Sequence, residues 1–319
     1  MKVSVLGCGR WGSFIGWYLV RNGHQIIQWG TEGNYTFDVL KNTGRNEYVE
    51  LDKRINLTSD LKFAVESSDI IIISISAQAL RSFMQRVTAF DVRDKKFVLC
   101  MKGIEVETGK RLSEVVIESG IDKNNVAVWV GPGHIQAFVQ GYPNCMVIDA
   151  YDKELVKMLA DNFRSNTIRF YYGDDIIGSE IGAAAKNVMG IAAGMLDGGG
   201  CTTLKGPLMA RGAREVARLI KAMGGNELSA YGLCHLGDYE TTLFSEYSNN
   251  RNFGEKYVKG VPFEKLAEGV STAKAMRMLG IKHDVDLPIT NAVYSIIYEK
   301  QDPKKVFMDL FSRSTRKEF

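Results

Sequence analysis

The chain has 319 residues, 45% of them hydrophobic and 24% charged, which suffices for about two domains of ordinary size with apolar cores. Forty basic and thirty-seven acidic residues leave a formal charge of +3 without a long run of one sign, so neither nucleic acid nor a membrane surface is an expected partner. Five scattered cysteines form no C-x-x-C pair and four histidines no H-E-x-x-H pair, so we predict no disulfide framework and no metal site. Apolar runs are too short for a signal-peptide core or a membrane-spanning helix, so we expect a cytoplasmic protein without membrane insertion.

The first half of the chain alternates short β-branched runs with helical stretches. We predict strands at residues 3–6, 24–29, 70–75, 96–101, 126–130, 146–148 and 167–171. This alternation is typical of an α/β fold with a mostly parallel sheet. After about Gly173 the β-type runs disappear, and glycines and prolines divide the rest of the chain into helices. The sequence therefore predicts a sheet domain over residues 1–175, followed by an all-helical domain over residues 176–319.

The first predicted strand ends at a glycine-rich turn that fits the pattern G-x-G-x-x-G, and a helical stretch follows it. The bare amides and the helix N-terminus of such a turn can bind a pyrophosphate. A glycine turn can also match this pattern by accident, but its place between a strand and a helix favours a dinucleotide and a Rossmann-type domain. The residues of this turn that we assign to the cofactor are Gly7, Gly9, Arg10, Trp11 and Gly12.

The end of the second predicted strand bears on which dinucleotide binds. An acidic residue there would hold a ribose hydroxyl of NAD, whereas an arginine would hold the 2′-phosphate of NADP. Glu32 comes late after this strand, and no arginine is present. The sequence leaves NAD and NADP open, with a slight preference for NAD.

Lys186, with Asn187 beside it, interrupts an apolar and glycine-rich run at residues 176–196. On a helix its ammonium would stand over a face of mostly small residues, which something could approach closely. A buried lysine shifts its pKa readily and suits proton transfer, whereas a lysine on a surface helix is only a solvated charge. This stretch alone leaves both interpretations open.

Two further segments lie at the carboxyl edge of the predicted sheet. Lys102 directly follows the strand at 96–101, at the edge where open α/β sheets bind ligands, although a lysine solvated at a strand end is the alternative. The turn at 131–134 has amides that could hold a phosphate or a nicotinamide, although such turns are common. We assign Gly131 of this turn to the substrate and Ile135, just after it, to the cofactor.

A polar segment in the helical half, residues 241–252, comes closely after Asp238. Its side chains could bind an anion, or the segment could be a solvated loop. The candidate anion-binding residues are Ser248, Asn249, Asn250 and Arg251.

Taken in order, these segments resemble the bacterial type of NAD(P)-dependent sn-glycerol-3-phosphate dehydrogenase. The resemblance runs from residue 3 to about residue 313. It rests on segments 5–12, 22–24, 29–30, 102–105, 131–132, 180–197, 211–212, 236–238, 253–254, 268–270, 272–273 and 287–290. It implies reversible hydride transfer between NAD(P)H and dihydroxyacetone phosphate, which gives sn-glycerol 3-phosphate for glycerophospholipid synthesis. It also suggests a homodimer.

The resemblance implies roles for individual residues. Lys186 would be the proton donor and acceptor, and Asp238 would hold its ammonium. Lys102 would contact both the substrate and the cofactor. The implied substrate positions are Asn187, Ser248 and Asn250, and Glu268 is the implied cofactor-side glutamate.

The chain departs from the family near the substrate phosphate. An ungapped alignment places Asn249 where the family has an arginine that serves the phosphate and the cofactor, and Arg251 is then the nearest replacement. A two-residue gap would instead align Arg251 with that arginine. His235 and Tyr239 also replace small or aliphatic residues around Asp238. Two alternatives therefore stay open: a dehydrogenase of another small phosphorylated or hydroxylated ketone, and a non-catalytic dinucleotide-sensing module.

Overall fold

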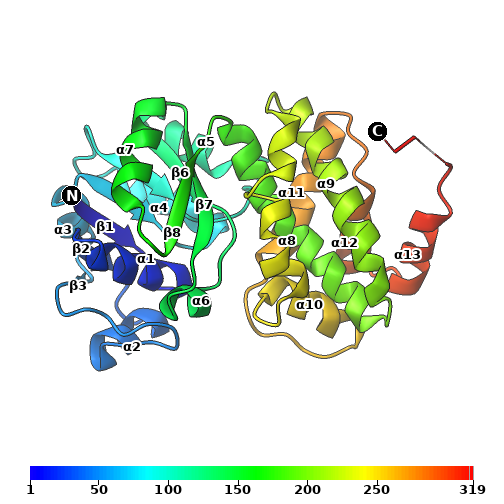
Figure 1. Cartoon of the computed structure of the whole chain (residues 1–319), viewed down its shortest axis with the longest axis horizontal. Coiled ribbons are helices and arrows are strands. Elements are labelled where there is room, and N and C mark those ends of the chain that lie inside the picture. Colours follow the sequence, from blue (N-terminus) through cyan, green and yellow to red (C-terminus); the bar gives the residue numbers. More distant parts are fainter. Residues whose placement is uncertain (316, 319) are drawn as a thin grey trace.

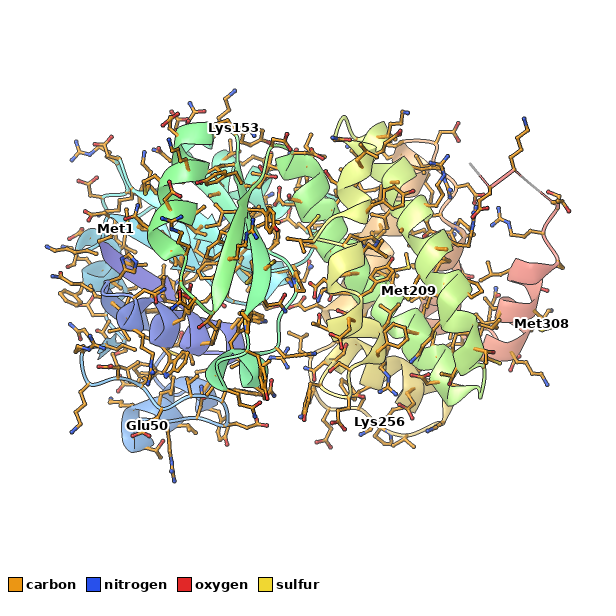
Figure 2. All side chains as sticks on the ribbon, in the orientation of Figure 1. Met1, Glu50, Lys153, Met209, Lys256 and Met308 are labelled. Carbon is orange, nitrogen blue, oxygen red and sulfur yellow. The ribbon has the colours of Figure 1, made fainter. Side chains whose placement is uncertain are left out.

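The computed structural model describes residues 1–315, 317 and 318, and it separates a sheet domain from a group of packed helices (Figure 1). Met1 in the sheet domain and Met308 near the C-terminus lie at opposite ends of the molecule (Figure 2). The predicted α/β sheet domain, followed by a helical domain, is confirmed. Among the described residues, none of the helices combines the length and the apolar character that crossing a membrane requires.

One eight-stranded sheet forms the first domain, in the order β3-β2-β1-β4-β5-β6-β7-β8. Every neighbouring pair is parallel except β6 with β7. Because the strand order reverses between β1 and β4, the carboxyl ends of these two strands flank a crevice where open α/β sheets bind ligands. The strands are β1 (Lys2–Leu6), β2 (Gln25–Trp29), β3 (Asn56–Thr58), β4 (Ile70–Ile73), β5 (Lys96–Leu99), β6 (Val126–Val130), β7 (Asn144–Ala150) and β8 (Ile168–Tyr172).

Helices cover both faces of this sheet, which explains why the central strands β4 and β6 are apolar throughout. The helices are α1 (Arg10–Arg21), α2 (Tyr35–Thr43), α3 (Leu61–Glu66), α4 (Leu80–Val87), α5 (Leu112–Glu118), α6 (Ile135–Val139) and α7 (Lys153–Phe163), with short 3₁₀ turns η1 (Ala77–Ala79) and η2 (Lys123–Asn125). In β4, Ile70 and Ile72 pack with α1, α6 and α7, while Ile71 and Ile73 pack with α3, α4 and α5. The alternation of side chains along a strand thus builds two cores.

From Ile176 onward, every regular element among the described residues is helical. These elements are α8 (Ile176–Gly198), η3 (Thr202–Leu204), α9 (Lys205–Ala222), η4 (Glu227–Tyr231), η5 (Leu236–Asp238), the π-helix η6 (Glu240–Phe244), α10 (Asn249–Val258), α11 (Glu268–Lys282), α12 (Pro288–Tyr298) and α13 (Pro303–Phe311). The central helix α8 is buried along most of its length. Glycine lets α10 approach it closely, because a Cβ on Gly194 would lie 1.9 Å from the carbonyl oxygen of Arg251.

Buried charges hold the start of α8 against the sheet domain. The Glu180 carboxylate accepts hydrogen bonds from the Arg111 guanidinium at 2.6 Å and from the backbone amide of Ser113 at 2.9 Å. Asp149 of β7 accepts a hydrogen bond from the Ser179 hydroxyl at 2.8 Å. Removing one partner of a buried ion pair is strongly destabilising, so these contacts fix where α8 leaves the sheet.

Candidate active site

A cleft of about 620 Å³ is lined by residues of both domains. The lining comes from the carboxyl edge of the sheet on one side and from α8, η6, α10 and α11 on the other. The residues assigned from sequence that line it are Gly7, Gly9, Arg10, Trp11, Lys102, Lys186, Asn187, Ser248, Asn249, Asn250 and Glu268. Segments far apart in the chain are therefore gathered around one cavity of a size usual for ligand sites.

In the glycine-rich turn after β1, a different structural constraint explains each glycine. Gly7 has a φ of +127°, and a Cβ there would lie 2.1 Å from the carbonyl oxygen of Ser74. A Cβ on Gly12 would lie 2.0 Å from the carbonyl oxygen of Gly7, so the third glycine lets α1 pack on the turn. Around Gly9 no atom lies within 4 Å of the Cβ position, which leaves room in the cleft for a pyrophosphate at the N-terminus of α1. This combination fits a dinucleotide.

Two lysines from different domains share one carboxylate oxygen. The Nζ atom of Lys186 on α8 lies 2.9 Å from Oδ2 of Asp238. The Nζ atom of Lys102, just beyond β5, lies 2.6 Å from the same oxygen. Only 1% of the Asp238 side chain is exposed, so it does not line the cleft but supports the two lysines that do. The carboxylate thereby links the sheet domain to α8.

The electrostatics of this cluster suit proton transfer. Burial lowers the pKa of Lys186 from its usual 10.5 to about 8, with Lys102 adding to the shift and Asp238 opposing it. Burial acts to raise the pKa of Asp238, but the two lysines outweigh it and leave that pKa below its usual value. Near neutral pH, therefore, Asp238 is an anion and Lys186 is a cation that can give up its proton at small cost.

Neighbouring groups fix the direction of each ammonium. The Thr242 hydroxyl lies 2.9 Å from the Nζ atom of Lys186 and donates to the backbone oxygen of Asp238 at 2.8 Å, so it accepts a hydrogen bond from the lysine. Lys102 donates to the carbonyl oxygen of Gly131 at 2.8 Å. Sequence reasoning did not assign Thr242 to the site. The signal was its position four residues after Asp238, which one turn of helix brings to the same face.

A chain of side-chain amides continues from the lysine cluster across the helical domain. Asn187 donates to the carbonyl oxygen of Lys102 at 3.2 Å and accepts a hydrogen bond from Asn250 at 2.9 Å. Asn250 in turn accepts a hydrogen bond of 2.9 Å from the backbone amide of Gly269 at the start of α11. Asn187 and Asn250 both line the cleft. They are therefore held in place while still reaching the space a substrate would fill.

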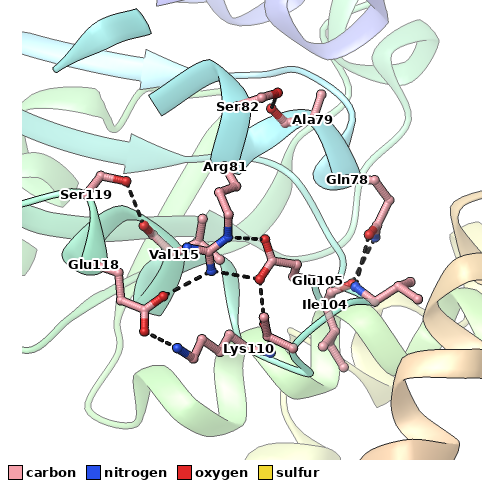
Figure 3. Close-up of polar contacts among 12 residues, drawn as sticks. Gln78, Ala79, Arg81, Ser82, Ile104, Glu105, Lys110, Val115, Glu118 and Ser119 are labelled. Carbon is pink, nitrogen blue, oxygen red and sulfur yellow. Dashed lines mark hydrogen bonds and ion pairs between the residues drawn. The ribbon is translucent and has the colours of Figure 1, made fainter. Parts of the chain in front are cut away.

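The loop just after Lys102 is held in a fixed course by side chains of the sheet domain (Figure 3). Arg81 of α4 binds the Glu105 carboxylate through two parallel hydrogen bonds of 2.7 and 2.8 Å. Gln78 donates to the carbonyl oxygen of Ile104 at 2.9 Å. Bidentate arginine–carboxylate pairs are geometrically specific, so they hold this loop, and with it the backbone next to Lys102, in one conformation.

The structure does not give Arg251 the phosphate-binding position expected of it. Its Nε atom lies 2.8 Å from Asp197 at the end of α8, its Nη2 atom lies 3.0 Å from Glu255, and it does not line the cleft. Asn249 lines the cleft instead, with its amide donating to the carbonyl oxygen of Leu266 at 3.2 Å. The charge of Arg251 instead helps to hold α10 to α8, and its contact with a substrate phosphate stays a prediction.

Three other assigned residues also lie outside the cleft lining: Gly12, Gly131 and Ile135. Gly131 contributes its carbonyl oxygen to Lys102, whereas its neighbours Gly133 and His134 line the cleft. Ile135 is 2% exposed and packs in the core of the sheet domain, because it begins α6 with its side chain turned toward the sheet. The Ile135 side chain therefore does not reach the cleft in this structure, and its contact with a cofactor stays a prediction.

The ends of β2 and β4 border the cofactor side of the cleft. Thr31 and Asn34 line the cleft after β2, whereas Glu32 is exposed and its carboxylate pairs with Lys41 at 2.7 Å. Glu268 lines the cleft near the residues after β4. Burial raises the pKa of Glu268, while hydrogen bonds from that segment oppose the shift. No acidic side chain at the end of β2 therefore distinguishes NAD from NADP.

A dinucleotide-binding turn and two lysines that share a buried aspartate, gathered at one cleft between domains, define a dinucleotide-dependent oxidoreductase. Comparison with known families makes this specific. The family models for the N-terminus and the C-terminus of NAD-dependent glycerol-3-phosphate dehydrogenase match residues 2–156 and 175–308. The chain belongs to this family.

Individual relatives agree over the full length of the chain. The glycerol-3-phosphate dehydrogenase (NAD(P)+) of Moorella thermoacetica is 36% identical over 310 residues, which cover 93% of this chain and 92% of the relative. The enzyme of that name from Thermoanaerobacter sp. (strain X514) is 34% identical, covering 100% and 99%. A crystal structure of glycerol-3-phosphate dehydrogenase from Coxiella burnetii superposes with a TM-score of 0.90 at 26% identity, covering 98% and 99%.

Proposed function

We propose that this protein interconverts dihydroxyacetone phosphate and sn-glycerol 3-phosphate with NAD(P)H, a reaction that supplies glycerophospholipid synthesis. The family and the names of its full-length relatives support this reaction and a cofactor that is NAD or NADP. The observation that carries the proposal is the cluster of Lys186, Asp238 and Lys102, whose two lysines line the same cleft as the glycine-rich turn. A module that only sensed dinucleotides would have no use for these three residues together.

The cofactor site consists of the turn after β1 and the cleft side of α11. Gly9 leaves the turn open to a pyrophosphate, Gly7 and Gly12 allow the close packing that shapes the turn, and Arg10 and Trp11 line the cleft beside it. Glu268 and Lys102 line the same cleft. A bound nicotinamide dinucleotide supplies the hydride for the reduction.

Lys186 provides the proton. As negative charge develops on the carbonyl oxygen of the substrate, the ammonium stabilises it and then protonates it, and in the reverse direction the neutral amine accepts that proton. Asp238 keeps the ammonium in place at 2.9 Å, and Lys102 approaches the substrate from the sheet side. The reacting oxygen would thus sit between side chains of both domains.

The substrate phosphate meets uncharged groups on the helical side of the cleft. Ser248 begins α10 as its N-cap, and Asn249 and Asn250 come next in the first turn. Hydrogen-bond donors at a helix N-terminus favour an anion. The substrate of our proposal is therefore a small phosphorylated ketone. Domain 1–175 contributes most of the cofactor site and domain 176–319 most of the substrate site, with Lys102 and Glu268 reaching the cleft from the opposite domain.

Two further parts of the proposal concern the protein as a whole. The five cysteines are free thiols, which fits a cytoplasmic protein. The resemblance of the sequence to the family suggests a homodimer. Sedimentation velocity of the purified chain tests the dimer, and a single species with the mass of one chain would refute it.

The deciding experiment is the oxidation of NADH and of NADPH by the purified protein with dihydroxyacetone phosphate as acceptor. We expect rapid turnover with at least one cofactor and little turnover with unphosphorylated dihydroxyacetone. Turnover with other small ketones instead would replace the substrate of the proposal. Binding of NADH or NADPH without turnover of any ketone would favour a sensing module.

A further inference from the structure

A second cavity, of about 530 Å³, lies in the helical domain and shares no lining residue with the active-site cleft. It is lined by the end of α8, one side of α9, the start of α12, α13 and the segment after α13. Met209 on α9 and Met308 on α13 mark the two flanking helices in Figure 2. Its floor is apolar, formed mainly by Leu196, Leu208, Ile289, Phe307 and Leu310.

Cations surround this apolar floor. Arg211, Arg214 and Arg218 succeed one another at helical spacing and so stand on one face of α9. Arg313 and Lys317 line the cavity from the segment after α13. Among the described lining residues, these five cations outnumber the two acids, Asp286 and Glu318. We call this cavity with its cationic border the arginine groove.

Neutral groups satisfy much of the hydrogen bonding in the arginine groove. Arg218 donates to the backbone oxygen of Asp286 at 2.7 Å, and Arg211 donates to the backbone oxygen of Glu318 at 3.4 Å. The Asp286 carboxylate pairs with Arg313. Burial lowers the pKa of Arg218, and its neighbours Arg214 and Arg211 lower it further, while nearby acids oppose them. The groove is therefore a half-buried region of positive potential over an apolar surface.

We propose that the arginine groove binds a single-chain amphiphile with a phosphate monoester head group. Guanidinium groups match phosphate oxygens in charge and in planar hydrogen-bond geometry. The adjoining floor of Leu196, Leu208 and Leu310 buries an alkyl chain, which a free phosphate does not supply. A purely apolar ligand would cover this floor without using the guanidinium groups at its border. The site is independent of the proposed reaction, because none of its residues lines the active-site cleft.

Dodecyl phosphate, kept below its micelle-forming concentration, is the probe. Titration calorimetry on the full chain, with saturating NADH and inorganic phosphate to fill the active-site cleft, should show saturable binding of one molecule per chain. Dodecyltrimethylammonium, with the same chain and a cationic head, should not bind. Binding of both amphiphiles with similar affinity would reduce the interaction to general adsorption and overturn the proposal.

Paired variants locate the site. Arg211→Gln with Arg214→Gln should weaken dodecyl phosphate binding by about tenfold or more, because two charged hydrogen-bond donors are lost. Lys304→Gln with Lys305→Gln removes two exposed charges from α13 outside the groove and should leave the affinity unchanged. Circular dichroism and the basal turnover show whether each variant is folded.

Three results would overturn the assignment. Equal weakening by both pairs would mean that only the overall charge matters. An absence of dodecyl phosphate binding, combined with dissociation of a wild-type oligomer by Arg211→Gln and Arg214→Gln in sedimentation velocity, would make the groove a contact between copies of this chain. Unaltered affinity in the arginine pair would place the ligand elsewhere.

Discussion

Two buried aspartates in this protein each bind two cations, with similar geometry and very different surroundings. At Asp238 the distances from nitrogen to oxygen are 2.6 and 2.9 Å, and at Asp197 they are 2.7 and 2.8 Å. In both clusters the two cations share a single oxygen, Oδ2. The cations are Lys102 and Lys186 at Asp238, and Lys205 and Arg251 at Asp197.

The surroundings separate a reactive cluster from a structural one. Both lysines at Asp238 line the cleft, and neither has a second carboxylate partner among the ion pairs of the described residues. Arg251 at Asp197 is also bound by Glu255, and neither it nor Asp197 lines the cleft. A pair of cations on an aspartate is therefore no sign of catalysis by itself. What matters is whether a ligand can reach the cations.

The largest effect should come from replacing Lys186 with methionine, which keeps the length of the side chain and removes the proton. We expect kcat to fall by about 10²–10⁴-fold, the usual contribution of a general acid. The affinity for NADH, measured by fluorescence titration, should change little. The matched variant Lys205→Met alters the Asp197 cluster and should lower stability rather than kcat. Turnover of Lys186→Met within a few-fold of wild type would remove this lysine from the mechanism.

Replacing each aspartate with asparagine tests the comparison directly. Asp238→Asn should reduce kcat by about 10–100-fold, because the ammonium of Lys186 loses the anion that holds it. Asp197→Asn should instead destabilise the fold by about 3 kcal/mol, since the buried Lys205 loses its carboxylate partner and Arg251 keeps only Glu255. Turnover assays and urea unfolding on both variants measure these effects. The comparison fails if Asp197→Asn reduces kcat as strongly as Asp238→Asn while remaining equally stable.

The parts of this arrangement that sequence could predict are those encoded by neighbouring residues. The turn from Gly7 to Gly12 was recognisable because a strand and a helix flank it in the chain. Lys186 stood out because apolar residues surround it. In contrast, residues 56–58 gave no strand signal, because β3 is three residues long with two polar side chains, and its pairing with β2 defines it.

The parts that sequence could not predict depend on contacts over long distances in the chain. Arg251 was a reasonable candidate for a phosphate, but its partner Asp197 is 54 residues away and only the packing of α10 on α8 brings them together. Thr242 and Lys186 are 56 residues apart in the chain, and the packing of η6 on α8 brings them together. Resemblance to the family indicated the residue types of the site. It could not show which cation faces the cleft.

The dependence of activity on pH should reflect the lowered pKa of Lys186. This lysine is protonated below about pH 8 and neutral above it. Ketone reduction needs the protonated form, so its kcat should fall by about tenfold for each pH unit well above 8. Alcohol oxidation needs the neutral form and should gain activity as the pH rises toward 8. Steady-state rates in both directions, measured from about two pH units below that pKa to about two units above it, test this dependence. A reduction rate that stays flat to pH 10 would contradict the assignment.

The smallest effect should come from placing an arginine on the cleft side of α10. Asn249→Arg adds a cation beside the proposed phosphate position, so KM for dihydroxyacetone phosphate should fall by several-fold while kcat changes little. Asn249→Gln lengthens the side chain without adding charge and is the matched control. Neither variant should improve the use of unphosphorylated dihydroxyacetone. Because Arg251 is bound to Asp197 and Glu255, it should not compete for this position. An equal gain for the phosphorylated and unphosphorylated ketones would show that Asn249 does not face the phosphate.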